Sequence, residues 1–477
     1  MSRPNTAPGQ NALNLGKSIP ETILRLSGPA ILEQFLICLA SLIDTAMVGS
    51  IGAAATASVA INISTVWLIN GCITALSVGF SFLVSHSVGE GSQEKTQSVV
   101  RQSITAALCL GSVLTIAVLS VHRSLPRILG AAPDVLPNAI TYLGIIGLGL
   151  VPQTLGVVLS AVLRSAGNTK IPLASNMTSN FLNVIGNFLL IYPARQLSLP
   201  FLKDTAFPVW GAGLGIKGAA ISTSLSQAAL AVMLLRHIYR SPTAARISPK
   251  GDYRFQKWTV RSLFHIGVPV LLERCTLCLG QISLTAIISG LGTVPLAAHY
   301  LTNQTEGLLY LPAYGFSYTA TTLIGQSLGA KDKPLAARFC KNICVISTAV
   351  ILAACFPVFL LSRGIIRLFT NDPQVAILGT RTLQIAAATE LFFSFSVVAS
   401  GVCRGAGDVK FPLAVSLIGM WGFRIGLVWL AVNVLALGVS GVWIAIAIDC
   451  FVRSCLFLFR FFSGKWMAAA EAEAEKI

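Results

Sequence analysis

Two carboxylates lie eleven residues apart in an apolar stretch long enough to cross a membrane, PAILEQFLICLASLIDTAMVGSIG at 29–52. They are Glu33 and Asp44. On a helix, eleven steps of about 100° turn both side chains to the same face, separated by about 16 Å along the axis. Because an ionised carboxylate in mid-bilayer costs about 2.5–3.5 kcal/mol on insertion scales, the pair predicts a polar stripe that faces away from lipid.

Polar side chains that complement the second carboxylate recur on later apolar stretches. Asn180, Asn183 and Asn187 share one stretch, in which Asn183 and Asn187 are one helical turn apart on one face. Ser222 and Thr223 follow in the next. Oxygen atoms from an aspartate, amides and hydroxyls suit a proton relay or a small hard cation such as Na⁺. We therefore predict a cation-coupling site, with interhelical hydrogen bonds between amides as the alternative, made of Asp44, Asn180, Asn183, Asn187 and Thr223.

A second polar set lies in the later half of the chain. Glu306 and Glu390 are acids inside apolar stretches, and Arg424 is placed to neutralise one of them. Asp449 is followed one turn later by Arg453, an order that favours a local ion pair. We predict a second cavity lined by Gln281, Gln304, Glu306, Glu390 and Arg424.

Membrane-spanning helices must hold these residues. Hydrophobic residues make up 54% of the chain and charged residues 11%, against roughly 25% charged in an ordinary soluble domain. The net charge of +16 arises mostly between apolar runs, so we expect no nucleic-acid partner. The N-terminal segment has no signal-peptide pattern, so we expect the first helix to be retained. The fold class is an all-α polytopic membrane protein with twelve predicted helices, at 27–50, 57–85, 102–121, 138–163, 173–193, 216–236, 264–290, 297–325, 342–361, 376–402, 413–435 and 439–462.

The two halves of the chain repeat with a constant offset of 240 residues. Pro29 and Glu33 return as Pro269 and Glu273, and the loop RSAGNTKIPL returns as RGAGDVKFPL. A register held over about 140 residues indicates two homologous six-helix bundles around a central cleft. The first half carries about 17 extra residues around 195–209.

Loop charges predict the orientation. Arg and Lys number 23 on the side that carries the termini and 8 on the other, so the positive-inside rule makes both termini cytoplasmic. Six helices per half give both repeats the same orientation. In a plasma membrane, the predicted division is a cytoplasmic N-terminal segment 1–26, an N-terminal lobe 27–236, a cytoplasmic linker 237–262, a C-terminal lobe 263–462 and a cytoplasmic tail 463–477.

The repeat separates scaffold from function. A polar residue present in both halves is interpreted as scaffold, and one present in a single half as functional. Glu33 and Glu273 are equivalent, so we interpret them as structural acids that cap backbone groups freed by the preceding prolines. Asp44 instead has Leu284 as its counterpart, and this asymmetry favours a coupling role.

Catalytic and metal-binding constellations are not recognisable in the sequence. The five histidines form no cluster, and the CxxC pair of Cys275 and Cys278 lies in an apolar helix without a second ligand pair. We expect no enzymatic activity, no metal and no cofactor. An integral membrane enzyme and a passive channel remain alternatives.

Several motifs resemble those of the multidrug and toxic compound extrusion (MATE) antiporters, over roughly residues 20–462. They are Asp-Thr-Ala-Met-Val-Gly at 44–49, Ala-Ala-His at 297–299, Pro-Ala-Tyr-Gly-Phe at 312–316 and Thr-Leu-Ile-Gly-Gln-Ser-Leu-Gly-Ala at 322–330. Glu-Gly-Leu-Leu-Tyr-Leu-Pro at 306–312 is similar to the bacterial DinF-like branch. The resemblance implies two lobes around a V-shaped cleft, with Asp44 on the family's first-helix acid and Asn183 and Asn187 on its fifth-helix polar positions.

The resemblance also implies a function. It suggests a monomer in lipid that exports amphiphilic, often cationic, drugs or metabolites by alternating access, driven by H⁺ or Na⁺. The seventh-helix glutamate of the NorM-like and eukaryotic branches is Leu277 here, which favours coupling through Asp44. The nearest alternative is a lipid-linked oligosaccharide flippase of the same superfold. A flippase would need a strongly cationic cavity, whereas the intramembrane charges here are mainly acidic.

Overall fold

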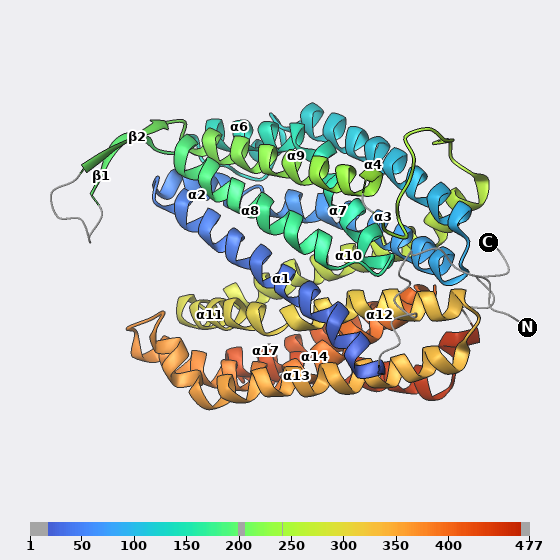
Figure 1. The fold of residues 1–477 in the computed structure, drawn as a ribbon. Coiled ribbons are helices and arrows are strands. Elements are labelled where there is room, and N and C mark those ends of the chain that lie inside the picture. Colours follow the sequence, from blue (N-terminus) through green and yellow to red (C-terminus); the bar gives the residue numbers. More distant parts are fainter. Residues whose placement is uncertain (1–17, 199–205, 241, 469–477) are drawn as a thin grey trace, which may run out of the picture.

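The computed structural model describes residues 18–198, 206–240 and 242–468. Within these residues the chain is helical apart from one β-hairpin (Figure 1). The helices of the first half are α1 (Ile19–Gly49), α2 (Ala53–Ala60), α3 (Ile63–Gly89), α4 (Gln93–Val121), α5 (Leu125–Ile128), α6 (Leu136–Leu148), α7 (Leu150–Ser165), α8 (Lys170–Leu190) and α9 (Ile216–Arg240). Those of the second half are α10 (Lys257–Ser289), α11 (Thr293–Leu309), α12 (Leu311–Gly329), α13 (Lys333–Arg367), α14 (Pro373–Gly405), α15 (Lys410–Leu417), the π-helix η2 (Ile418–Ile425), α16 (Gly426–Asn433) and α17 (Gly438–Phe462).

Twelve membrane spans account for these helices. Among the described residues, nine helices are long and apolar enough to cross a bilayer, and α6 with α7 forms a tenth span with a 51° bend. The helix α8 and the pair α11–α12 complete the twelve; both carry asparagine, glutamine or glutamate side chains that lower their hydropathy. The predicted all-α fold of two six-helix halves is confirmed.

Most of the observed helices are longer than the predicted spans. The first begins at Ile19 rather than near residue 27, and α10 begins at Lys257 rather than near 264. Their polar first turns extend beyond the apolar stretch, so hydropathy alone gave no signal for them. Parts of the predicted terminal segments 1–26 and 463–477 lie outside the described residues.

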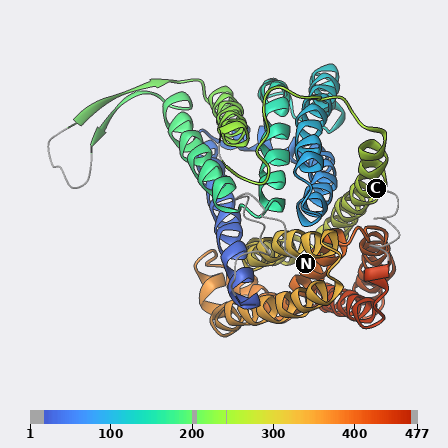
Figure 2. The same cartoon turned by 45° about the vertical axis from the view of Figure 1, so that its right-hand side comes forward.

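The extra residues of the first half form a β-hairpin. Strand β1 (Pro193–Ser198) pairs antiparallel with β2 (Ala206–Ala212), with Arg195 opposite Val209. The Arg195 guanidinium stacks on the rings of Phe188 and Tyr192, at 4.3 and 4.1 Å from their centroids. Figure 2 shows the hairpin projecting away from the helices.

The first helix of each half packs against the other half. Helix α1 packs on α8 of its own half and on α12 of the second, and α10 packs on α3 of the first half (Figures 1 and 2). Apart from these helices and from Val409, which joins the cluster of the first half, each half is packed around its own buried side chains. Helix α1 begins at the same end of the molecule at which α3, α7, α12 and α14 terminate. We call this end of the molecule the base.

Candidate functional site

Asp44 on α1 receives a hydrogen bond from α8. Asn187 Nδ2 donates to Asp44 Oδ1 across 2.6 Å, and the same nitrogen lies 3.5 Å from Asn183 Oδ1. Both asparagines are buried, whereas Asp44 is partly exposed. The structure thus brings together the acid and the two amides that the sequence singled out.

Helix α9 extends this network. Asn183 Nδ2 lies 3.3 Å from Thr223 Oγ1 and 3.5 Å from Ser222 Oγ, and Ser222 Oγ donates to the Asn183 carbonyl across 2.8 Å. A Cβ at Gly186 would stand 2.4 Å from Ser222 Oγ, so this glycine permits the close approach of α8 and α9. A continuous polar chain therefore runs from Asp44 to Thr223.

The equivalent helix crossing in the second half is apolar. Leu284 stands at the repeat position of Asp44, and Leu427 at that of Asn187. Leu284 is buried in a cluster of aliphatic side chains against which Leu427 packs. The common scaffold is therefore compatible with apolar residues at this crossing, and the polar chain is particular to the first lobe.

Asn180 lies outside the network, and Tyr142 lies beside it. Asn180 Nδ2 donates to the Leu36 carbonyl across 3.3 Å, so it braces α8 against α1 instead of contacting Asp44. Tyr142 on α6 interacts electrostatically with Asp44. Comparison of the halves does not single out Tyr142, because its repeat counterpart, Thr382, is also polar.

The oxygen atoms around Asp44 define what the site can hold. Asn187 Oδ1 is buried and forms no hydrogen bond to another described residue. A protonated Asp44 fits the network directly, since a neutral acid is tolerated at membrane depth. A small hard cation would find ligands in the Asp44 carboxylate and in the amide oxygens of Asn187 and Asn183.

The acids of the second half also lie close together. Glu390 on α14 is fully buried; Ser394 Oγ donates to its Oε1, and its Oε2 has no hydrogen-bond partner among the described residues. Glu306 on α11 and Glu390 interact electrostatically with each other, and Tyr310 interacts with both. Within the part of the chain that the structure describes, Gln281 and Gln304 make no side-chain hydrogen bond, and Gln304 is exposed.

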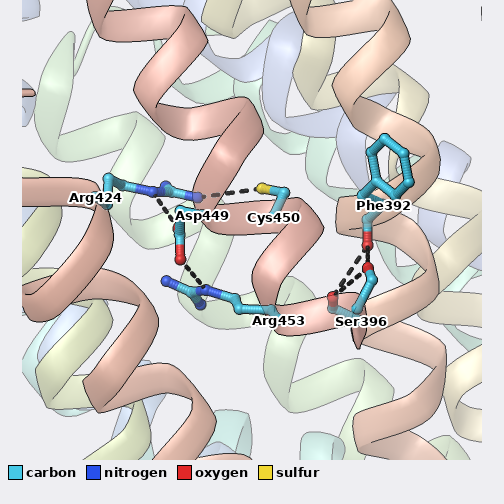
Figure 3. Close-up of polar contacts among 7 residues, drawn as sticks. Phe392, Ser396, Arg424, Asp449, Cys450 and Arg453 are labelled. Atoms are coloured by element: carbon cyan, nitrogen blue, oxygen red, sulfur yellow. Dashed lines mark hydrogen bonds and ion pairs between the residues drawn. The ribbon is translucent and has the colours of Figure 1, made fainter. Parts of the chain in front are cut away.

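Arg424 pairs with a different acid from the two expected. Its Nε donates to Asp449 Oδ2 across 2.7 Å, and Arg453 Nε donates to Asp449 Oδ1 at the same distance (Figure 3). The predicted pair of Asp449 and Arg453 is therefore present. Arg424 forms its direct ion pair with Asp449 and interacts with Glu306 only through longer-range electrostatic attraction. Since η2 packs directly on α17, Asp449 is the acid within reach of Arg424.

Glu33 and Glu273 form buried ion pairs. Arg164 Nη1 donates to Glu33 Oε1 across 2.8 Å, and Asn176 donates to the same oxygen across 2.8 Å. Arg404 Nη2 donates to both oxygens of Glu273, at 3.1 and 3.0 Å. The two carboxylates therefore do not cap backbone freed by the prolines; an arginine at the end of α7 or α14 reaches them first.

The lobes meet at the base through equivalent contacts. His86 Nε2 lies 3.0 Å from the Gly405 carbonyl, and Gln326 Nε2 donates to the Ser165 carbonyl across 2.9 Å. The two contacts are related by the repeat, because His86 matches Gln326 and Ser165 matches Gly405. Cβ atoms at Gly89 and Gly329 would stand 2.1 Å from the Gln326 carbonyl oxygen and 2.3 Å from that of His86, respectively. At the base, the backbones of the two lobes are therefore in direct contact, which closes this end of the molecule.

Metal-binding geometry is absent from the described residues, where no three His, Cys, Asp or Glu side chains are placed to hold a metal ion. The CxxC cysteines, Cys275 and Cys278, are free thiols.

Relatives and solved structures share this architecture. The MatE family model matches residues 29–189 and 269–430, so its two copies begin 240 residues apart. The chain is 26% identical over 469 residues to a probable multidrug resistance protein NorM of Thermotoga maritima, covering 96% of each chain. It is 25% identical over 446 residues to the uncharacterized transporter YisQ of Bacillus subtilis, covering 94% of this chain and 95% of YisQ.

Two solved structures have the same fold at 20% sequence identity. A MOP superfamily transporter from Pyrococcus furiosus superposes with a TM-score of 0.85 over 97% of this chain and 99% of its own. An outward-facing multidrug resistance MATE family transporter superposes with a TM-score of 0.86 over 96% of this chain and 98% of its own. Assignment to the DinF-like branch stays a prediction. The family match covers both halves, and the chain belongs to the MatE family of multi-pass membrane transporters.

Proposed function

We propose that this transporter exports amphiphilic compounds in exchange for H⁺ or Na⁺, by alternating access and as a monomer in lipid. The observation that carries the proposal is the hydrogen bond of 2.6 Å between Asn187 and Asp44, at a crossing that is apolar in the second lobe. A carboxylate at membrane depth that the shared scaffold does not require is retained for binding an ion. Names of relatives such as NorM support multidrug export.

Ion loading would act through the packing of α1. A neutralised Asp44 tolerates a dry contact with Asn187 and Asn183, whereas an ionised one needs water or a bound cation. Loading therefore favours a closer packing of α1 on α8 and would narrow the space beside these two helices that a substrate could occupy. Because α1 also packs on α12 of the second lobe, its movement alters the contact between the lobes.

The second-lobe acids are a further candidate for coupling. Glu306, Glu390 and Asp449 would carry three negative charges against the two positive charges of Arg424 and Arg453, when all five are ionised. Asp449 is already occupied by both arginines. One proton or monovalent cation shared by Glu306 and Glu390 would balance the group. Two ions per cycle, one in each lobe, would allow the membrane potential to contribute to export, at about 2.3 kcal/mol per charge per 100 mV.

The proposed orientation puts both termini and the base in the cytoplasm of a bacterial cell. The excess of Arg and Lys on that side supports it. In intact cells, a cysteine at Arg246 in the half-joining linker should resist an impermeant maleimide, and one at Trp210 in the hairpin should react. Labelling of both positions from the same side would contradict the orientation. Phe201, at the centre of the extra segment, lies outside the described residues.

A flippase for lipid-linked oligosaccharides remains the alternative function. Buried acids neutralise Arg164, Arg404, Arg424 and Arg453, which disfavours the strongly cationic cavity that a flippase needs. Reconstitution in proteoliposomes tests both functions. Uptake of a fluorescent amphiphilic cation under an imposed pH or Na⁺ gradient supports antiport. If neither gradient drives uptake and a labelled lipid-linked sugar is translocated without one, the antiport proposal is wrong.

A further inference from the structure

Arg274 is a cation in the middle of a membrane-spanning helix, at the contact between the lobes. It lies midway along α10, which packs on α3 of the first half. A Cβ at Gly71 on α3 would stand 3.6 Å from Arg274 Cβ. Toward the base the two helices approach more closely, so that a Cβ at Gly79 would stand 2.8 Å from the Leu263 side chain. Arg274 therefore lies at the end of this helix contact that is farther from the base.

No carboxylate among the described residues forms an ion pair with Arg274. The adjacent Glu273 attracts Arg274 electrostatically but directs both of its oxygens to Arg404. The two other arginines deep within spanning helices, Arg424 and Arg453, share Asp449. Arg274 Nε is buried without a hydrogen-bond partner among the described residues. A charged group at this depth is costly unless it is paired, so its retention indicates a partner that binds there.

Two tyrosines lie near the Arg274 guanidinium. Tyr314 and Tyr318, both on α12, interact with it electrostatically. The Tyr318 ring also receives Arg164 of the first lobe, 4.7 Å from its centroid. The Arg274 side chain is partly exposed, so one part of it is accessible to a ligand while its Nε is buried.

The ion pairs nearest to Arg274 leave its positive charge without a direct partner among the described residues. Glu33 is neutralised by Arg164 and Glu273 by Arg404, which leaves the charge of Arg274. The repeat counterpart of Arg274 is Gln34, so the scaffold does not require a cation at this position. Arg274, like Asp44, is therefore a charged residue that only one half contains.

We propose that Arg274, together with Tyr314 and Tyr318, binds a carboxylate on the amphiphile that the protein transports. The inference rests on the proposed export function and refines its substrate class, from cationic compounds in general to zwitterions and acids with an aromatic body. A guanidinium binds a carboxylate through two parallel hydrogen bonds. The tyrosine rings offer apolar area and a hydroxyl beside it.

Two dyes that differ only at a carboxylate test the proposal. Tetramethylrhodamine has a free carboxylate beside its cationic ring system, and its methyl ester has none. Binding of each dye to the purified protein in phosphatidylcholine nanodiscs is followed by fluorescence anisotropy without any ion gradient. We expect the wild type to bind the acid at least tenfold more tightly than the ester. Arg274→Gln, which installs the residue of the repeat counterpart, should abolish this preference, and Arg274→Lys should keep part of it.

The controls separate recognition from folding and from coupling. Arg381→Gln removes an exposed arginine near the start of α14 and should keep the wild-type ratio. If Arg274 had a purely structural role, Arg274→Gln would weaken the binding of both dyes to the same extent. If Arg274→Gln folds poorly, the acid-to-ester ratio of the wild type and of Arg274→Lys decides the question. An unchanged ratio in Arg274→Gln, or a wild type that does not prefer the acid, overturns the proposal. Because no gradient is applied, either result is independent of whether Asp44 couples transport.

Discussion

Arg164 and Glu33 form an ion pair of 2.8 Å between residues 131 positions apart, and the same pair recurs in the second half as Arg404 and Glu273. Each pair joins the first helix of a half to the last turn of its fourth span. Since both lobes contain the pair, it belongs to the scaffold that holds the first helix in place. Polar residues found in only one half, such as Asp44 and Arg274, are additions to this shared scaffold.

Replacing one partner of this pair should damage folding more than transport. Glu33→Gln leaves Arg164 as an unpaired buried charge, and breaking a buried pair costs about 3–5 kcal/mol. We expect a lower unfolding temperature and yield, with transport per folded molecule largely retained. Exposed Glu94→Gln on α4 is the matched control and should behave as the wild type. A well-folded Glu33→Gln protein that no longer transports would show that this acid is functional.

Closure of the base should depend on Gly89. An added methyl group would stand 2.1 Å from the Gln326 carbonyl oxygen of the other lobe. Overpacking of this kind costs about 1–3 kcal/mol, which corresponds to a shift of about fivefold to a hundredfold toward base-open molecules. Gly49→Ala is the control, because nothing lies within 4 Å of its added Cβ.

Spin labels at Gln93 and Arg338, both exposed near the base on different lobes, report the shift as a distance distribution. We expect the longer distances to gain population in Gly89→Ala but not in Gly49→Ala. Identical distributions in both variants would mean that the base contacts do not hold the lobes together.

The repeat made much of this architecture predictable. Hydropathy located the twelve spans, and comparison of the halves singled out Asp44, whose contact with Asn187 the structure supplies. The ends of α1 and α10 were not predictable, because their polar first turns carry no hydropathy signal. The β-hairpin was also not predicted, because comparison of the halves showed only that the first half has additional residues there.

Ion pairs between side chains far apart in the sequence could not be predicted. Arg164 and Arg404 were counted only as loop charges, although each forms a buried ion pair with a glutamate of the first helix of its half. The direct ion pair of Arg424 with Asp449 was not predicted, because sequence distance does not reveal which helix η2 faces. Arg274 was overlooked, although its asymmetry with Gln34 was visible in the repeat.

The amides around Asp44 should matter less than the acid and more than Asn180. A hydrogen bond to a charged group contributes about 1.5–3 kcal/mol, so Asn187→Ala should slow gradient-driven transport roughly tenfold to a hundredfold. Asn180→Ala removes a bond to the Leu36 carbonyl and leaves the network around Asp44 intact. Initial rates in proteoliposomes should therefore rank wild type and Asn180→Ala above Asn187→Ala. If Asn180→Ala were slower than Asn187→Ala, the coupling network would lie on the face of α8 that carries Asn180, and our assignment of it to Asn187 would be wrong.

Gradient-driven uptake by Asp44→Asn in proteoliposomes tests the central claim most directly. Asparagine keeps the size and hydrogen-bonding reach of a protonated aspartate but can neither release a proton nor offer a charge to Na⁺. The variant is expected to fold as the wild type does, to bind the amphiphile with altered affinity, and to show no uptake under an imposed pH or Na⁺ gradient. Uptake by Asp44→Asn at the wild-type rate would contradict the account, and Glu306 and Glu390 would then be the acids that couple transport.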